Sequence, residues 1–364
     1  MSKAAELAKM GEVLTNSQIG GRRNIVINGA MKVSQRSTSA TSITSTGYHA
    51  LDRFKLLYTD AGTWTMSQSS TTPNGFANSL KLDCTSAKSS LASDSRLFLM
   101  TSIEGQDVQQ FKKGTSDAEQ YTLSFHVRSN KTGTYQVNIE DNDNVRIVGS
   151  TYTISSANTW EKKEITFVAD TTGAFADDNG DSLAIMWALV AGTDNSSGAV
   201  PTAWEAKSNT DRGAGLNINL ADSTSNEWYI TGVQLEVGST ATPFEHRSFG
   251  EELLLCQRYF EMLGRNPDSD TFSFANMPTK IAQQGSYVQG HGYRVLKRAV
   301  PTVVIFSRNG TSGKVSVFAT GSDASNNWSI NSGGYVGFHA AVRDTGTHTQ
   351  GDGFEYGFTA DAEL

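Results

Sequence analysis

The segment from Trp228 to Gly238 constrains the fold of this chain more than any other, because it predicts a β-strand with a bulge. Apolar residues alternate along it, but the odd/even count slips at Thr231-Gly232. A one-residue slip would turn half of the apolar set outward unless one extra residue is absorbed, and glycine can absorb it. Pro243 then ends the pairing. We predict that five apolar side chains of this segment reach one core: Trp228, Ile230, Val233, Leu235 and Val237.

The composition favours short strands and many turns. Of 364 residues, 37% are hydrophobic and 18% charged, low values for a globular enzyme, and 34 are glycine. Such a chain is long enough for two domains. Its formal net charge of -7 argues against a nucleic-acid partner, since phosphate binding needs a concentrated positive field.

Targeting signals are not evident in the sequence. No run approaches the length of a transmembrane helix, so membrane insertion is not expected. The start Met1–Glu6 lacks the apolar core of a signal peptide. We therefore expect synthesis in a cytoplasm without export by that route.

Residues 1–22 form the first segment of the predicted organisation. Residues 3 to about 16 read as a short helix with an apolar seam at Leu7, Met10 and Leu14. So short a helix needs a partner in water. It is either a docking or oligomerisation element or a frayed terminus.

Residues 23–247 are predicted to form an all-β domain of the jelly-roll or β-sandwich kind. Alternation runs from Tyr121 to Arg128, and after the turn at 130–133 it resumes from Tyr135 to Ile139. This pattern predicts a hairpin with one wet face. Further strands are expected at 160–168 and 182–190, with no helical period between them.

Beyond this domain the period changes and then returns to β. Phe249 to Leu263 has helical spacing and is predicted to be a linking helix, within residues 248–264, that stops at Gly264. Residues 265–364 read as a second, smaller β-sandwich domain. The predicted fold class is thus all-β, with two β domains, a short N-terminal helix and a short interdomain helix.

Two acidic turns could hold a structural calcium ion. They supply the hard oxygen ligands of Asp141 and Asp143 and of Asp177, Asp178 and Asp181. Neither has the order of an EF-hand, and Asx-rich turns are common without metal, which is the favoured interpretation. No other cofactor is expected.

The sequence offers no catalytic constellation, and we expect no enzyme activity. Its six histidines include no HxxxH pair, and no GxSxG is present. The many carboxylates leave a sugar-cleaving pair open, because sequence cannot give the separation of two carboxylates.

Several segments, in family order, resemble bacteriophage tail-fibre and related virion proteins that carry a carbohydrate-binding-module-like jelly roll. They are Arg23–Arg36, Tyr48 with Asp52-Arg53-Phe54, Tyr121–Phe125 and Trp228–Phe260. The stretches Lys297–Val303 and Thr359–Leu364 are similar to the C-terminal β domain that often follows it.

The resemblance implies a structural component of a tailed phage virion, most simply a tail fibre that recognises the host surface. It implies a homotrimer, other phage tail or virion proteins as partners, and a host cell-surface glycan as receptor. Ligand residues do not carry over from the family. The alternatives are a virion scaffold, such as a head decoration or tail adaptor, and a surface polysaccharide hydrolase.

Candidate ligand-binding residues are aromatic or charged side chains in or beside turns, where a ring could cover the apolar face of a sugar. They are Trp204, Tyr293, Arg294, Trp328 and His348. The competing interpretation is packing over the edge of a core. Because the N-terminal helix suits anchoring, host contact is expected in residues 265–364, and the alternative is that this domain only caps the trimer.

Overall fold

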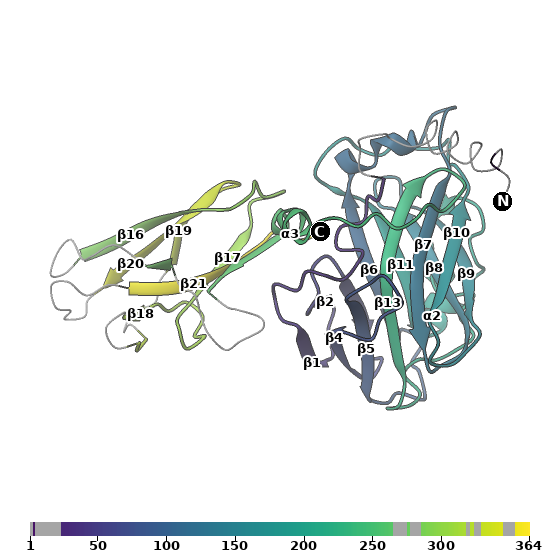
Figure 1. Ribbon diagram of the computed structural model, residues 1–364, viewed down its shortest axis with the longest axis horizontal. Coiled ribbons are helices and arrows are strands. Elements are labelled where there is room, and N and C mark those ends of the chain that lie inside the picture. Colours follow the sequence, from purple (N-terminus) through teal and green to yellow (C-terminus); the bar gives the residue numbers. More distant parts are fainter. Residues whose placement is uncertain are drawn as a thin grey trace. The chain divides into compact units, whose positions relative to one another are not determined.

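The computed structural model describes Lys3 and residues 23–264, 275–276, 285–317, 321–323, 329–344 and 354–364. The predicted oligomerisation residues Leu7, Met10 and Leu14 lie outside this part, as do Trp328 and His348. The described part is all-β, as predicted: antiparallel sheets with a few short helices (Figure 1). None of the helices in it combines the length and hydropathy needed to cross a membrane.

The chain forms two compact units. Unit 1 contains Met1–Lys32 and Ser39–Ser248, and unit 2 contains Val33–Thr38 and Phe249–Leu364. The sequence predicts a first β domain over residues 23–247, a linking helix within 248–264 and a second domain from residue 265, whereas unit 2 already begins at Phe249 and also contains Val33–Thr38.

Unit 1 is built from two antiparallel sheets. Sheet A contains, in spatial order, β1 (Ser39–Ile43), β4 (Thr63–Ser69), β5 (Ser79–Ser86), β13 (Glu227–Val237), β7 (Tyr121–Ser129) and β10 (Glu161–Phe167). Sheet B contains β12 (Glu205–Ala206), β9 (Arg146–Ile154), β8 (Gly133–Asp141), β11 (Asp181–Ala191), β6 (Arg96–Glu104), β3 (Lys55–Thr59) and β2 (Gly47–Tyr48). Short helical turns follow β6, β11 and β12, namely η1 (Gly105–Asp107), η2 (Gln109–Phe111), α2 (Thr193–Ser196) and η3 (Asn209–Asp211).

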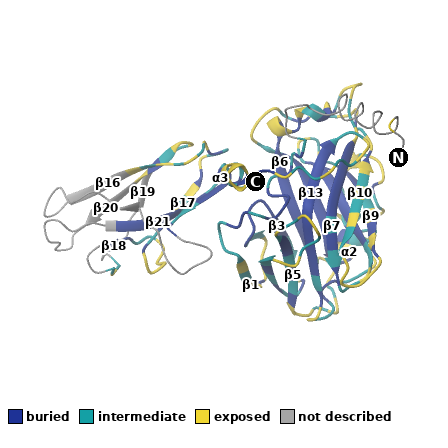
Figure 2. Cartoon of the chain, in the orientation of Figure 1, coloured by how far each residue is buried: buried dark blue, intermediate teal, exposed yellow. Residues whose placement is uncertain are grey.

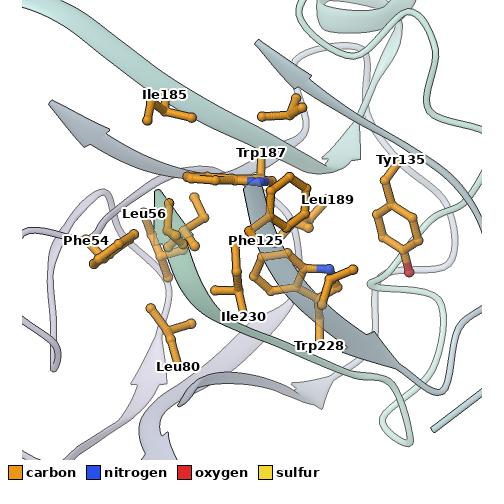
Figure 3. Close-up of a cluster of buried hydrophobic side chains, with 14 of the residues drawn as sticks. Phe54, Leu56, Leu80, Phe125, Tyr135, Ile185, Trp187, Leu189, Trp228 and Ile230 are labelled. Carbon is orange, nitrogen blue, oxygen red and sulfur yellow. The ribbon is translucent and has the colours of Figure 1, made fainter. Parts of the chain in front are cut away.

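The inner faces of the two sheets enclose one hydrophobic core (Figures 2 and 3). Phe125 and Trp228 enter it from sheet A and Trp187 from sheet B, each fully buried. Burying a large apolar side chain contributes about 1.5–3 kcal/mol, so each of these residues stabilises unit 1.

The predicted bulge in β13 is confirmed. Its pairing with β7 shifts register between Thr231 and Gln234, and Gly232 has a φ of 65°. A Cβ at Gly232 would lie 2.7 Å from Cζ of Phe76, so space as well as backbone conformation requires glycine. The predicted core side chains are fully buried, apart from Val237, which is half-buried and packs against them.

The predicted hairpin over residues 121–139 is wrong. Both strands exist, but β7 pairs with β13 and β10, whereas β8 pairs with β9 and β11. The turn between them therefore crosses from one sheet to the other. Alternation identifies the apolar face of each strand, and two such faces can meet across a core as well as side by side.

Unit 2 is organised around β21 (Phe354–Asp361). This strand pairs with β14 (Phe260–Leu263), β15 (Ala275–Asn276), β17 (Thr302–Phe306) and β18 (Ser316–Val317). A separate three-stranded sheet contains β16 (Gly285–Gly292), β20 (Gly337–Asp344) and β19 (Ser329–Gly333).

The predicted linking helix is only partly correct. Helix α3 covers Phe249–Gln257, but Phe260–Leu263 forms β14. Pairing with β21 supplies ladder hydrogen bonds to this short apolar run, which periodicity alone cannot distinguish from a helical turn.

Residues 33–38 are a structural part of unit 2. The Arg36 guanidinium lies 3.7 Å from the centroid of the Phe260 ring and pairs with Asp361 at 3.2 Å. Gln35 donates to the Phe260 carbonyl at 2.8 Å. A fragment that begins at residue 265 would lack both this segment and β14, so full-length variants are the appropriate material for experiments.

Candidate functional site

The residues that carry the family resemblance interlock in unit 1. The Asn24 amide donates to the Val233 carbonyl at 3.0 Å and accepts from the Leu235 N–H at 3.2 Å. The Val233 N–H donates to the Gly29 carbonyl at 2.9 Å. A Cβ at Gly29 would lie 2.1 Å from the Val233 oxygen, so the approach is possible only for glycine.

The exit from β13 is fixed to the same segment. The Glu245 carboxylate accepts from the N–H groups of Arg23 at 2.8 Å and Asn24 at 2.7 Å. Arg247 is buried and donates to the carbonyls of Asn24 and Val26. These contacts engage Asn24, Glu245 and Arg247 within the fold of unit 1.

The outer face of sheet B is closed over β8 by the chain itself. Gln136, Asn138 and Glu140 point away from the core, yet their exposed fractions are 0%, 0% and 2%. Residues 192–219, hereafter the strap, cover them. The wet face predicted for this strand is therefore wrong.

Each of the three side chains binds the strap. Gln136 donates to the Asp211 carbonyl and Asn138 to the Arg212 carbonyl, at 2.7 and 2.8 Å. Arg212 donates to both oxygens of Glu140 at 2.7 Å. This bidentate geometry is typical of a strong, charge-assisted pair.

The outer face of sheet A carries a partly exposed aromatic cluster. It consists of Phe76, His126, Phe244 and His246 and is called the aromatic cluster below. The Phe76 ring centroid lies 5.2 Å from that of His126, 5.1 Å from Phe244 and 5.3 Å from His246. His246 is exposed and the other three are half-buried. Rings at these separations are in contact with one another, and the two phenyl rings give the cluster its apolar part.

Local structure explains why these four rings meet. His126 lies on β7 between core residues, so alternation turns it outward, beside the bulge. Thr231 donates to the Asn78 carbonyl at 2.7 Å, which fixes the loop that carries Phe76. Thr242 binds the buried Glu236 carboxylate at 2.7 Å, which fixes the segment that carries Phe244 and His246.

The two imidazoles of the cluster favour their neutral form. Burial, with a smaller contribution from Lys162, lowers the pKa of His126. Burial, followed by Lys32, lowers the pKa of His246. Nδ1 of His126 is buried and has no hydrogen-bond partner among the described residues. A neutral imidazole carries one donor and one acceptor nitrogen, and at His126 the buried Nδ1 is not accessible to a ligand.

A second aromatic side chain on this face, Tyr229, is buried by its neighbours and is not accessible to a ligand. Tyr229 is 4% exposed and lies between Lys81 and Arg128, whose charged groups are 5.6 and 4.8 Å from its ring centroid. Its hydroxyl donates to Glu227 at 2.9 Å, and the Trp160 ring lies 6.1 Å away. Both faces of Tyr229 are thus used within the protein.

The candidate residues predicted from the sequence do not form one site. Trp204 belongs to unit 1, packs against its core and donates its indole N–H to the Val168 carbonyl at 2.8 Å. This is the packing role that the sequence left as the alternative.

Tyr293 and Arg294 lie together in unit 2. The Tyr293 ring is 5.9 Å from that of Phe338, and burial raises the pKa of its hydroxyl to about 12. The Arg294 side chain is exposed, while its backbone N–H points to Glu261 at 3.2 Å.

The five candidate calcium ligands do not converge. Asp143 accepts from the Ala176 N–H, Asp178 from the Gly180 N–H and Asp181 from the Ser102 hydroxyl, while Asp177 is exposed. Burial raises the pKa of Asp181. Across the described ranges, no group of three or more His, Cys, Asp or Glu side chains could hold a metal ion.

Asp141 instead belongs to an oxygen cage around the buried Lys113 ammonium. Nζ of Lys113 lies 2.5 Å from Asp141 and 3.1 Å from Asp170. It also donates to the carbonyls of Thr172 and Gly173, at 2.8 and 2.7 Å. The Lys113 ammonium thus occupies the position among these oxygens that a metal cation would otherwise take.

The aromatic cluster was not predicted as a site. Phe76 stands alone in the turn-rich stretch after Pro73, and Phe244 follows Pro243 in the strand exit. An isolated aromatic residue in each of two turns was the available signal, but nothing in the sequence shows that the two turns meet.

Comparisons with known proteins add a weak likeness of fold. No family model matches the chain, and no curated protein matches it. The enzymatically active domain of bacteriophage CBA120 tailspike protein 4 aligns at a TM-score of 0.31 and 14% identity, over 59% of this chain but only 21% of that one. The chain therefore spans about a fifth of that tailspike domain.

Carbohydrate-binding modules align over most of their own length. The family 11 module from Clostridium thermocellum, solved with a mixed-linked tetrasaccharide, aligns at a TM-score of 0.28 and 12% identity, over 58% of this chain and 99% of that one. The module TmCBM61, solved with β-1,4-galactotriose, aligns at 0.28 and 10% identity, over 59% and 99%. At these values the likenesses do not extend to function.

Proposed function

We propose that this chain is a non-enzymatic structural protein of a tailed phage virion, of the tail-fibre kind, that binds glycan on the host surface. The observation that carries the glycan-directed part is the aromatic cluster. Phe76 and Phe244 offer a half-buried apolar surface that the C–H face of a pyranose can cover, while His126 and His246 supply polar groups at its edge.

The virion part rests on the family resemblance. Its motif residues Asn24, Gly29 and Glu245 interlock around β13. Assembly as a homotrimer, and docking to other tail proteins through residues 1–22, belong to the same proposal. Sedimentation of the full-length protein tests self-association, with a monomer as the contrary result.

The sequence predicts that the host contact lies in residues 265–364, whereas the aromatic cluster favours a contact in unit 1. In unit 2, Tyr293 and Arg294 are the predicted residues that the structure describes. Full-length variants can separate the two surfaces without the loss of β14 that a fragment would suffer.

The scaffold alternative is favoured by one observation. Of nine large apolar side chains exposed in the described part of the chain, seven belong to unit 2. They include Val336 at 71% exposure, and Leu296 and Phe249 at 57%. Where such side chains gather into a patch, they are typical of protein–protein contact.

A glycan array with full-length protein tests the proposal. We expect the wild type to bind a subset of glycans, and Phe76→Ala with Phe244→Ala to lose that binding at least tenfold. Tyr335→Ala, which removes an exposed ring from unit 2, is the matched control and should bind as the wild type does. Loss of binding in Arg294→Ala alone would move the contact to unit 2.

Two other outcomes decide between the alternatives. Binding to no glycan, by a protein that assembles into virions, would support the scaffold. Release of reducing sugar from host polysaccharide would reveal a hydrolase and contradict the non-enzymatic part of the proposal.

A further inference from the structure

We infer that the aromatic cluster selects acidic glycans, in which a pyranose ring carries a carboxylate. This inference rests on the proposed function, because it names the class of sugar that the same surface would bind. It is carried by two lysines that border the cluster.

Lys162 borders the cluster on the β10 side. It is the cross-strand neighbour of His126, and its side chain is 42% exposed. Its ammonium pairs with Glu164 at 2.6 Å, but Glu164 is 51% exposed, so the pair is open to solvent and to exchange with a ligand.

Lys32 borders the cluster beside His246. Its ammonium donates to the carbonyl of Arg247, the next residue along the chain, at 3.2 Å. This partner is neutral, so the positive charge of Lys32 is held in place without being cancelled.

The carboxylates near the cluster are already bound within the protein. Glu245 accepts two backbone N–H groups at the start of unit 1. Glu236 is buried and binds Gln234 and Thr242. Neither of these carboxylates pairs with Lys32 or Lys162, so both ammonium groups can face an anionic ligand, although the whole chain has a formal net charge of -7.

The arrangement assigns separate roles to the two kinds of residue. The Phe76 and Phe244 rings cover the C–H face of the sugar, and the ammonium groups approach a carboxylate at the edge of its ring. An ion pair between either lysine and the carboxylate of a bound sugar would be exposed to solvent. Removal of one lysine should therefore weaken binding by about two- to fivefold, and salt should screen this contribution.

The test compares acidic sugars with their uncharged methyl esters, which keep the ring and its stereochemistry. Trigalacturonic acid, a glucuronate trisaccharide and a sialyl trisaccharide, each with its methyl ester, are titrated against full-length protein in 20 mM and 200 mM salt. We expect at least one acid to bind several-fold more tightly than its ester, with the difference reduced at 200 mM.

Four variants locate this preference. Lys32→Gln and Lys162→Gln should reduce it, and Glu164→Gln should increase it by freeing Lys162. Lys112→Gln, at an exposed ion pair with Glu119, is the matched control and should leave it unchanged. Thermal melts confirm that each variant is folded.

The outcomes separate this inference from the proposed function. Equal binding of acid and ester, lost in Phe76→Ala, would overturn the acidic preference and leave glycan binding standing. An acidic preference that neither lysine variant alters would place the charge recognition elsewhere and overturn the inference. If the protein binds none of these sugars and no glycan on the array, both the acidic preference and the proposed glycan binding are overturned.

Discussion

The outer face of sheet B in unit 1 is covered by the chain, whereas the outer face of sheet A is partly exposed. Alternation along the strands predicts a polar, exposed surface for both. On sheet B the polar residues Gln136 and Asn138 are fully buried, because the strap lies over them. On sheet A the bulge at Gly232 and two anchored loops leave aromatic rings half-exposed. Alternation shows which side chains leave the core, but not what covers them.

The largest expected effect comes from the covered face. Glu140→Ala removes the carboxylate that pairs with Arg212, whose side chain is 12% exposed, and with Lys207. Breaking a buried pair leaves a charge uncompensated, so we expect a loss of about 3 kcal/mol in the free energy of unfolding. Urea denaturation measures it. A loss below about 1 kcal/mol would mean that the strap is held mainly by its other contacts.

The next effect comes from the open face. Gly232→Val must adopt a φ of 65° and bring a Cβ within 2.9 Å of Nδ1 of His126. We expect a loss of about 2–3 kcal/mol in unfolding free energy, together with weaker glycan binding because the aromatic cluster is displaced. Gly29→Ala is a useful comparison, since it clashes with backbone in the motif interlock rather than at the cluster. Normal glycan binding by a folded Gly232→Val protein would argue against the cluster.

Acid should lower the stability of unit 1 through the two histidines on the outer face of sheet A. His126 and His246 have folded pKa values below the ordinary 6.5, so the unfolded chain takes up protons more readily than the folded one. Their contribution to stability is therefore complete above about pH 6.5 and is lost as pH falls through the unfolded pKa towards the folded one. Denaturation midpoints between pH 7.5 and 5 measure it, and His126→Gln should flatten the curve. An unchanged curve in that variant would remove His126 from the explanation.

The smallest expected effect is that of chelation. The ammonium of Lys113 already fills the oxygen cage of Asp141 and Asp170. Adding EDTA should therefore change the melting temperature of unit 1 by less than about 1 °C, whereas removal of a metal that binds only the folded state would lower it in proportion to its affinity. A clear drop that calcium reverses would restore the structural calcium considered from the sequence.

Part of this architecture could be read from single segments. The slip between Ile230 and Val233 identified the bulge, because side-chain direction in a strand depends only on local count. The same local count identified β7 and β8 as strands but paired them wrongly, since partner choice depends on distant residues. It also could not decide between helix and strand at Phe260, where β21 contributes the hydrogen bonds.

The candidate site was beyond the reach of local patterns. Phe76 and Phe244 come from separate turns that meet only because both are anchored to β13. Trp204, one of the five predicted ligand-binding residues, donates its indole N–H to the Val168 carbonyl and packs against the core. Whether a ring is available to a ligand depends on tertiary contacts that no single segment contains.

The most direct test follows the side chains of unit 1 by NMR during titration with the tightest glycan from the array. If the aromatic cluster binds the glycan, we expect shifts in the imidazole signals of His126 and His246 and in the amides of Thr231 and Gly232, with the strap amides from Asp211 to Gly215 unchanged. Shifts confined to the strap, or to Tyr293 and Arg294 of unit 2, would contradict it.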